Sequence, residues 1–326
     1  MRAVGIILAG GNNNRMKELT HKRAVAAMPI AGSYRSIDFA LSNMTNSHIQ
    51  KVAVLTQYNA RSLNEHLNSS KWWNFGRKQG GLYVFTPTIT NDNGYWYRGT
   101  ADAIYQNMDF LKKSHEPYVV IASGDAVYKM DYSKVLQYHI DKKADVTVVC
   151  KEMDPSDDVS RFGTIRMDDD MRITEFEEKP MVTKSNMIST GIYVIRRRLL
   201  IDLIEHAAEE ERFDFVNDVL IRYKNLKKIY GYKIDHYWSN IATVDAYYKT
   251  NMDFLKPEVR NYFFKQDPEI YSKVSDLPPA KYNPGASVKN SLVGSGSIIN
   301  GTVENSVIFK QVFVGNNCVI KNSIIL

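Results

Sequence analysis

Short apolar runs alternate with amphipathic stretches over residues 1–255 of this 326-residue chain, and this alternation constrains the fold more than any other feature. The runs suit strands buried on both faces, and they occupy residues 2–9, 51–55, 118–122 and 146–150. Between them, apolar residues recur at helical spacing: Ile37, Ala40, Leu41 and Met44, and then Tyr105, Met108 and Leu111. Strands that alternate with helices predict an α/β domain with a mainly parallel sheet sandwiched by helices.

Two glycines and an arginine follow the first predicted strand, where a nucleotide-binding loop would lie. Gly10 and Gly11 let the backbone approach a phosphate chain, and Arg15 offers a bidentate phosphate contact. Ligands of such sheets bind beyond the carboxyl ends of the strands, and Asp125 also follows a predicted strand. We therefore expect the loop and Asp125 to face one cleft. The middle of the loop, residues 12–14, holds three asparagines where close phosphate approach calls for glycine.

Composition sets the broad class of protein. A chain of 326 residues is long enough for about two domains, and 44% hydrophobic with 24% charged residues suits a soluble globular protein. No run approaches the roughly 18 apolar residues of a membrane span, and no signal peptide precedes the first strand. Cys150 and Cys318 lie far apart and form no metal-binding or redox motif. We therefore expect a cytoplasmic protein without a membrane partner.

The net charge of +6, from 42 basic and 36 acidic residues, indicates anionic partners. Nucleic acid is the partner usually inferred for a basic chain, but no long Lys/Arg run and no interleaving of aromatic and basic residues supports it. Sugar phosphates, nucleotides and phosphorylated effectors are equally anionic. We expect a partner of that kind and no nucleic acid. His48 and His139 have no second ligand at a useful spacing, so we expect neither to bind a metal.

The C-terminal part of the chain has a different pattern. Residues 256–284 are rich in proline and polar residues, which predicts a linker packed over the first domain. Over residues 285–326, short apolar units are separated by small residues and asparagine, and Ile308, Val314 and Ile320 fall six apart. This spacing predicts a parallel β-helix of a few coils, in which each rung buries its apolar residue against the next. We expect a partner chain to cover the exposed last rung.

Several motifs in fixed order resemble one enzyme family, the glucose-1-phosphate adenylyltransferases, also called ADP-glucose pyrophosphorylases. In sequence order they are Ala-Gly-Gly at 9–11, Lys-Arg-Ala at 22–24, Arg-Ser-Ile-Asp-Phe-Ala-Leu-Ser-Asn at 35–43, Trp-Tyr-Arg-Gly-Thr-Ala-Asp-Ala at 96–103, Gly-Asp at 124–125, Phe-Glu-Glu-Lys-Pro at 176–180, Gly-Ile-Tyr-Val at 191–194 and Tyr-Trp at 237–238. The resemblance covers nearly the whole chain.

This resemblance implies both a fold and a reaction. The fold is a Rossmann-like nucleotidyltransferase domain followed by a short left-handed parallel β-helix. In the family, glucose 1-phosphate attacks the α-phosphate of ATP and yields ADP-glucose and pyrophosphate for bacterial glycogen biosynthesis. The reaction needs aligned reactants, neutralised phosphate charge and a Mg²⁺ ion that bridges phosphate oxygens.

The resemblance also assigns roles to individual residues. The catalytic pair is Arg15 and Asp125. The nucleotide-binding residues are Gly10, Gly11, Gln57, Gly99 and Thr100. The sugar-phosphate residues are Gly163, Glu178, Lys179, Ser189, Tyr193 and Trp238. The effector-binding residues are Lys22, Arg23 and Arg35, and Trp96 lies in a block that transmits effector signals. Simpler structural interpretations stay open. Glu178 and Lys179 can form an exposed ion pair, the effector candidates can be solvated surface cations, and Trp96 can be a core aromatic.

Four departures from the family pattern fall on the nucleotide and metal side. Asn240 stands where the family has a second metal-binding aspartate, which leaves Asp125 as the one charged metal ligand. Val25 replaces a phosphate-binding lysine, and Ala126 replaces a histidine. The fourth departure is the asparagine run at 12–14.

These losses predict a regulatory subunit that is weakly active or inactive alone and does not hold Mg²⁺ firmly. Such a subunit would join catalytic adenylyltransferase chains in a heterotetramer and tune their allosteric response, and the short C-terminal part fits this role. The alternative is a catalytically competent ADP-glucose pyrophosphorylase with a divergent nucleotide loop. A solitary sugar-phosphate sensor or scaffold has no support beyond the retained sugar side.

Overall fold

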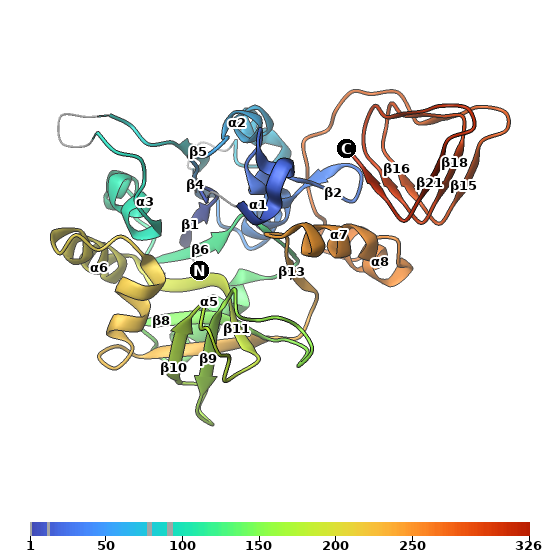
Figure 1. The fold of residues 1–326 in the computed structure, drawn as a ribbon. Helices are drawn as coiled ribbons and strands as arrows, with labels where there is room; N and C mark the ends of the chain where they lie inside the picture. The colour runs from blue at the N-terminus through green and yellow to red at the C-terminus, as the bar shows by residue number, and fades with distance from the viewer. Residues whose placement is uncertain (1, 12–13, 77–79, 90–93) are drawn as a thin grey trace.

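The computed structural model describes residues 2–11, 14–76, 80–89 and 94–326 (Figure 1). A large α/β domain has its strands at the centre and helices around them, and a β-helix formed by the C-terminal residues stands at one side of it. The helices α7 (Val244–Asp253) and α8 (Pro257–Phe264) lie between the two parts. The predicted fold class, a Rossmann-like domain followed by a β-helix, is confirmed.

The central sheet is mainly parallel around the strand that begins the chain. Its strands are β1 (Ala3–Leu8), β4 (Lys51–Leu55), β5 (Gly81–Phe85), β6 (Tyr118–Ser123), β8 (Val146–Glu152), β9 (Gly163–Met167), β10 (Ile173–Glu178), β11 (Met187–Arg196) and β12 (Ile229–Ile234). The order is β10-β9-β11-β6-β1-β4-β5, and β8 pairs with β11 and β12. Strands β6, β1, β4 and β5 are parallel, whereas β11 runs antiparallel to β6, β8 and β9.

Both faces of this sheet are buried, as the apolar runs predict. Along β1, Ile7 belongs to one hydrophobic cluster while Val4 and Ile6 belong to the cluster on the opposite face. Helix α1 (Ser36–Asn46) covers the first face with the four apolar residues that recur at helical spacing. Helices α3 (Thr100–Gln106), α4 (Met108–Lys112) and α6 (Arg197–Glu209) contribute to the second face.

The structure departs from the second helical pattern. The residues Tyr105, Met108 and Leu111 do not lie on one helix, because α3 and α4 are separate helices that meet at Asn107. Tyr105 is 44% exposed and does not join the core. The side-chain amide of Asn107 donates to the hydroxyl of Tyr97 at 2.9 Å and to the carbonyl of Ala103 at 2.9 Å, which anchors the junction.

The segment 256–284 contains a helix as well as irregular chain. Helix α8 occupies Pro257–Phe264, and the ammonium group of Lys129 donates to the carbonyls of Tyr262 at 2.8 Å and Gln266 at 2.5 Å near its C-terminal end. These contacts fix α8 against the α/β domain. The remaining helices are α2 (Arg61–Leu67) and α5 (Tyr132–Asp141). None of the helices in the described ranges is both long and apolar enough to span a membrane.

The β-helix consists of three small parallel sheets. They are β14 (Lys281–Tyr282), β17 (Ile298–Ile299) and β20 (Phe313–Val314); β15 (Ser287–Lys289), β18 (Thr302–Glu304) and β21 (Val319–Lys321); and β16 (Leu292–Val293), β19 (Val307–Ile308) and β22 (Ile324–Ile325). The hexad residues Ile308, Val314 and Ile320 share one interior cluster, as predicted. Strand β14 pairs with β17, so the β-helix begins before residue 285.

The β-helix packs directly on the α/β domain. Leu255 forms a buried cluster with Val307 and Phe309 of the β-helix. The hydroxyl of Tyr248 on α7 donates to the carbonyl of Asn322 at 2.9 Å. Apolar burial and a hydrogen bond therefore hold the two parts together, so residues of both can contribute to one site.

Candidate active site

The ends of two parallel strands bring the glycine loop and Asp125 to the same edge of the sheet. Strands β1 and β6 pair in register up to Leu8 and Ser123, and the amide of Gly124 donates to the carbonyl of Leu8 at 2.9 Å. Gly10 and Asp125 follow these ends directly. Both line one cavity, as expected from the sequence.

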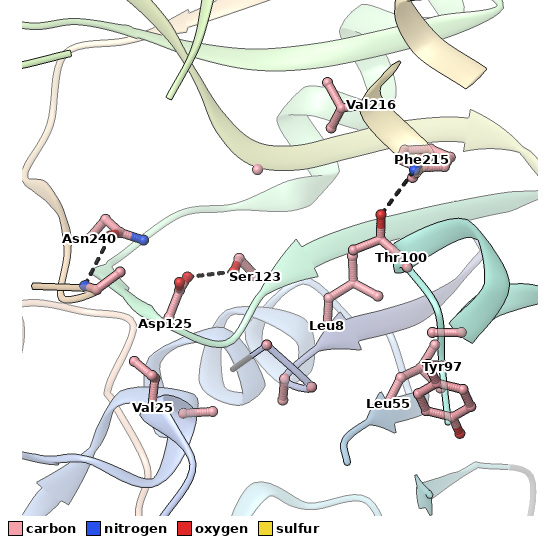
Figure 2. A pocket seen from close by; sticks show the side chains of 18 of the residues that line it. Leu8, Val25, Leu55, Tyr97, Thr100, Ser123, Asp125, Phe215, Val216 and Asn240 are labelled. Carbon is pink, nitrogen blue, oxygen red and sulfur yellow. Dashed lines mark hydrogen bonds between the residues drawn. The ribbon is translucent and has the colours of Figure 1, made fainter. Parts of the chain in front are cut away.

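This cavity, which we call the main cleft, has a volume of about 590 Å³ (Figure 2). It gathers residues that the sequence predicts for three separate roles. From the nucleotide, catalytic and sugar-phosphate sets these are Gly10, Gly11, Arg15, Gln57, Gly99, Thr100, Asp125, Lys179 and Tyr193. Asn240 and Val25, two of the departures from the family pattern, line it as well. Of the predicted asparagine run, Asn12 and Asn13 lie outside the described residues.

The nucleotide side of the main cleft is held by backbone contacts. The side-chain amide of Gln57 accepts a hydrogen bond from the amide of Tyr97 at 3.0 Å and donates to its carbonyl at 3.3 Å. The hydroxyl of Thr100 accepts from the amide of Phe215 at 2.9 Å. Gly99 is required for packing, because a Cβ there would come within 2.3 Å of the carbonyl oxygen of Phe213. The start of α3 is therefore fixed beside the cleft.

Asp125 and Asn240 meet across a short antiparallel pair. Strand β13 (Trp238–Asn240) pairs with β7 (Ala126–Tyr128), and Asn240 lies opposite Ala126. The hydroxyl of Ser123 donates to Oδ1 of Asp125 at 2.5 Å. The amide of Ala242 donates to Oδ1 of Asn240 at 3.0 Å. Figure 2 shows both side chains at the same end of the cleft.

This donor set does not fit a two-carboxylate Mg²⁺ site. Asp125 supplies one carboxylate, whereas Asn240 supplies an amide whose oxygen already accepts a backbone hydrogen bond. Mg²⁺ prefers charged oxygen ligands, and substrate phosphates would have to supply the rest of the coordination. Among the residues that the structure describes, no group of three His, Cys, Asp or Glu side chains is arranged to hold a metal ion.

Two further departures remove expected polar groups from the end of the cleft near Asp125, which we call the reaction end. Val25 is buried, belongs to a hydrophobic cluster and lines the cleft with an aliphatic side chain. Ala126 is also buried in the core. Neither residue can neutralise or donate to a phosphate oxygen. The cationic charge expected from a lysine at position 25 is therefore absent there.

The sugar-phosphate residues divide between the cleft wall and the layer behind it. Lys179 and Tyr193 line the cleft. Glu178 lies behind, with a side chain only 15% exposed and 3.1 Å from the ammonium group of Lys179. Burial raises the pKa of the Glu178 carboxyl, and Lys179 opposes that shift. Gly163 leaves room for this carboxylate, because a Cβ there would lie 2.8 Å from Oε2 of Glu178.

Ser189 and Trp238 are buried and do not line the main cleft. The hydroxyl groups of Ser189 and Tyr193 are 3.2 Å apart, so Ser189 contacts a cleft residue and not the cleft itself. The ring of Trp238 packs edge-on against Phe162 at 5.6 Å and lines a neighbouring cavity. For these two residues the structure supports a role in orienting the cleft wall.

Arg161 is a cleft residue that the sequence predictions miss. It lines both the main cleft and the neighbouring cavity, and its Nη1 donates to the hydroxyl of Thr243 at 3.2 Å. Its position two residues before Gly163, a predicted sugar-phosphate residue, is the one signal that could have identified it.

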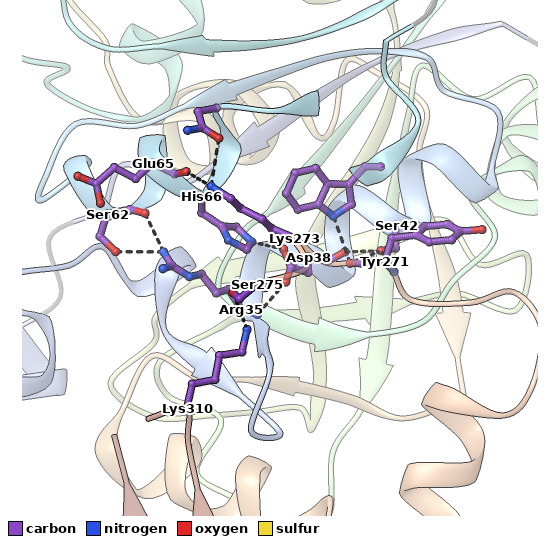
Figure 3. Close-up of polar contacts among 12 residues, drawn as sticks. Arg35, Asp38, Ser42, Ser62, Glu65, His66, Tyr271, Lys273, Ser275 and Lys310 are labelled. Atoms are coloured by element: carbon purple, nitrogen blue, oxygen red, sulfur yellow. Dashed lines mark hydrogen bonds and ion pairs between the residues drawn. The ribbon is translucent and has the colours of Figure 1, made fainter. Parts of the chain in front are cut away.

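None of the three predicted effector residues, all of them described, lines the main cleft, and Arg35 lies near Lys310 of the β-helix (Figure 3). Nη1 of Arg35 donates to the carbonyl and hydroxyl of Ser62 at 2.7 and 3.0 Å, which fixes the guanidinium. Lys310 extends from the β-helix toward Arg35 and donates to the hydroxyl of Ser275 at 3.2 Å. Lys22 is exposed and Arg23 is half-buried.

Arg35 is repelled by the charges of both Arg23 and Lys310, and the carboxylate of Asp38 opposes the effect on Arg35 and on Lys310. Burial lowers the pKa of Lys310, and the charge of Arg35 lowers it further. Burial also lowers the pKa of Arg35. The charge of Asp38 opposes this shift, whereas the charge of Arg23 increases it. Side chains from the α/β domain and the β-helix therefore converge in a cationic cluster, which we define as Arg23, Arg35 and Lys310.

Trp96 does not belong to the core. Its side chain is 61% exposed, and its ring stacks on Tyr58 with centroids 5.8 Å apart and an interplanar angle of 14°. The interpretation of Trp96 as a core aromatic is therefore wrong. Tyr58 directly follows Gln57, which lines the main cleft, so the stacked pair lies next to the nucleotide side.

Comparison with known proteins agrees with this architecture. A Nucleotidyl transferase family model matches residues 4–257, and a family model described as GlmU-like, C-terminal hexapeptide matches residues 278–326. Proteins named glucose-1-phosphate adenylyltransferase from Clostridium botulinum, Thermosipho melanesiensis and Geobacillus stearothermophilus are 42%, 39% and 39% identical. Each alignment covers 98% of this chain, and 84%, 77% and 83% of the respective relative. The chain belongs to the glucose-1-phosphate adenylyltransferase family of nucleotidyl transferases.

Proposed function

We propose that this chain is a regulatory subunit of glucose-1-phosphate adenylyltransferase, with little or no activity alone. It would assemble with catalytic chains in a heterotetramer and adjust their response to phosphorylated effectors. The reaction it would regulate joins ATP and glucose 1-phosphate to give ADP-glucose and pyrophosphate. The proposal rests on the family membership and on the chemistry of the cleft.

The observation that carries the proposal is the pairing of Asp125 with an amide. Asn240 occupies the position beside Asp125 where a second carboxylate would hold Mg²⁺, and its oxygen accepts a backbone hydrogen bond. Val25 adds an aliphatic wall where a cation would neutralise phosphate. Single electrostatic groups of this kind contribute roughly 3 to 4 kcal/mol to transition-state stabilisation, although such contributions need not add. Losing two of them predicts very slow turnover.

The retained parts of the cleft favour ligand binding over chemistry. Lys179, Tyr193 and the half-buried Glu178 supply cationic and hydrogen-bonding groups for a sugar phosphate. Binding needs complementary charge and shape, whereas turnover also needs stabilisation of charge that develops in the transition state. A cleft with this composition is suited to sense a substrate without transforming it.

The cationic cluster of Arg23, Arg35 and Lys310 supports an effector role. Its members come from both parts of the chain, and their mutual repulsion would be relieved by a bound polyanion. A phosphorylated metabolite is the class of ligand that such a cluster accepts. Binding there would tighten the contact between the α/β domain and the β-helix.

The alternative function is that of a competent adenylyltransferase. One observation favours it: the main cleft still gathers the glycine loop, Arg15, Asp125 and Lys179 in one cavity. Substrate phosphates could complete the coordination of Mg²⁺ around a single carboxylate. This alternative predicts ordinary turnover by the chain alone, which separates it from the regulatory role.

Mass photometry tests the assembly claim directly. The chain is measured alone, then mixed with the catalytic adenylyltransferase chain of the same organism, and an unrelated nucleotidyl transferase of similar size serves as the control. We expect a mixed species of tetrameric mass only with the catalytic chain. If the mixture gives only the sum of the separate spectra, the regulatory proposal is wrong.

A further inference from the structure

Two cavities meet at one end of the main cleft. The second cavity has a volume of about 630 Å³ and lies between the end of β8, the loop before β9 and the start of α7. Three residues line both cavities: Arg15, Arg161 and Asn240. A ligand that reaches from the main cleft into the second cavity therefore passes two arginines.

Arg161 is built into this junction and is not a mobile surface cation. It is half-buried, its Nη1 donates to the hydroxyl of Thr243 at 3.2 Å, and its guanidinium lies over the ring of Phe162 at 4.7 Å. Burial lowers the pKa of Arg161, Asp158 opposes that shift, and the charge of Arg15 adds to it. The two arginines line the same two cavities, and their charges repel each other.

Three carboxylates, Asp158, Asp125 and Asp157, offset this repulsion at Arg161. Hydrogen bonds from Ser160 lower the pKa of Asp158, and the charges of Arg161 and Arg15 lower it further. Asp158 is exposed and also accepts a hydrogen bond from the amide of Ser160 at 3.0 Å. Its charge acts on both arginines of the junction.

Beyond the junction carboxylates outnumber the two lysines, Lys151 and Lys249, that line the second cavity. The second cavity is lined by further carboxylates, which include Asp154, Asp157, Asp245 and Asp253. A long polyanion would be repelled there, since like charges at short range are unfavourable in a partly buried site. The junction therefore suits a short anion that has enough charge for two guanidinium groups.

We propose that Arg161 is a second phosphate-binding residue, which acts with Arg15 to bind a diphosphate at the junction without a divalent cation. The ligand class is a phosphoanhydride, either free pyrophosphate or the end of a nucleoside triphosphate. Each guanidinium can make a bidentate contact with one phosphate. The bound anion then replaces Asp158 as the negative charge beside the arginines. The inference goes beyond the regulatory role, because binding at the junction does not depend on partner chains.

This assignment explains how the cleft can bind phosphate with a weakened metal site. Val25 supplies no cation at the reaction end, and Asn240 in place of a carboxylate weakens the binding of Mg²⁺ there. Two guanidinium groups can supply positive charge from the protein itself, and arginine keeps its charge at every physiological pH. A single sugar phosphate has one phosphate group and cannot engage both arginines in the same way.

Isothermal titration of the full chain with sodium pyrophosphate in EDTA tests the proposal. We expect binding in EDTA, weakened about tenfold or more in Arg161→Met, since each charge-assisted contact is worth roughly 1.5 to 3 kcal/mol. Arg166→Met is the matched control, because Arg166 is an exposed residue of β9 that faces Glu175 at 3.6 Å. Asp158→Asn keeps the acceptor for Ser160 but removes its negative charge, so we expect tighter binding.

Arg161→Met is expected to weaken pyrophosphate binding and Asp158→Asn to strengthen it, and a loss of folding could not produce both results. Arg161→Lys is a further variant that keeps the positive charge. Orthophosphate and glucose 1-phosphate are titrated in parallel, and we expect both to bind more weakly than pyrophosphate and to depend less on Arg161. Absence of pyrophosphate binding in EDTA, or equal effects of Arg161→Met and Arg166→Met, would overturn the proposal. Either result leaves the mass-photometry test of the regulatory role unaffected.

Discussion

At the residue scale, two uncharged side chains decide how the cleft can act. Asn240 presents an amide beside Asp125, and Val25 presents an aliphatic group where phosphate charge needs neutralising. Elsewhere in the described part of the cleft, the hydroxyl of Ser123 donates to the Asp125 carboxylate at 2.5 Å and Lys179 lines the cavity. The difference from the family pattern at these two positions is therefore one of charge.

Restoring the charges should restore chemistry. We expect the double variant Asn240→Asp with Val25→Lys to synthesise ADP-glucose at a rate at least about tenfold above the unmodified chain, since each group contributes several kcal/mol at most. The measurement is pyrophosphate release with ATP, glucose 1-phosphate and Mg²⁺. The control is Asn64→Asp with Val274→Lys, which makes the same exchanges at exposed positions. No gain over this control would assign the defect to the asparagine loop instead.

His139 predicts a pH dependence of stability. Its side chain is buried, its Nδ1 lies 2.8 Å from the hydroxyl of Thr147, and burial lowers its pKa to about 4. In the unfolded chain the pKa is about 6.5, so the unfolded state takes up a proton first as the pH falls. Stability contributed by the neutral imidazole is therefore complete above about pH 6.5 and is lost progressively towards pH 4, by up to about 3 kcal/mol.

Urea unfolding at several pH values between 7.5 and 4.5 checks this expectation. His139→Gln should show a flatter dependence of the unfolding free energy on pH than the unmodified chain. His115→Gln, at an exposed position, should leave the slope unchanged. Identical slopes for both variants would exclude His139 as the titrating group.

The sequence predicts which residues belong to the cleft better than it predicts how far each side chain is buried. The glycine loop, Arg15, Asp125 and Lys179 were predictable because they follow strand ends or family motifs. The burial of Glu178 and Ser189 was not, because it depends on contacts between β9, β10 and β11 that bring distant segments together. Arg161 was missed for the same reason, since its partner Thr243 lies at the start of α7.

At the element scale, periodicity predicts regular segments and misses interruptions. The strand at 51–55 matches β4, and the hexads of the β-helix match its interior. The pattern of Tyr105, Met108 and Leu111 fails, because side-chain bonds of Asn107 end one helix and begin another. Helix α8 falls within the predicted linker, because its stability depends on packing and on Lys129 from the α/β domain, which no local pattern reveals.

A matched pair of valines tests the packing of the β-helix. Val314 is 2% exposed inside a coil, whereas Val319 on the outer surface is 64% exposed. We expect Val314→Ala to lower the free energy of unfolding by about 2 kcal/mol through lost apolar burial and the cavity that remains. Val319→Ala should change it by less than about 0.5 kcal/mol. Urea titration of both variants is the measurement, and equal effects would contradict the assigned interior.

At the scale of the whole molecule, the contact between the α/β domain and the β-helix can carry a signal. The cationic cluster of Arg23, Arg35 and Lys310 spans that contact. In a mixed assembly with catalytic chains, we expect Lys310→Met to raise the concentration of phosphorylated effector needed for half-maximal response. The control Lys289→Met removes another lysine of the β-helix from an exposed position. A response unchanged by Lys310→Met would exclude this residue from the effector site.

The most direct test of the regulatory account is ADP-glucose synthesis from ATP, glucose 1-phosphate and Mg²⁺. It is measured for this chain alone, for the catalytic chain of the same organism alone, and for the two combined. The account predicts negligible synthesis by this chain alone and, in the combination, a higher rate or a changed effector response relative to the catalytic chain. Rapid synthesis by this chain alone would contradict it, because Asn240 and Val25 would then support catalysis.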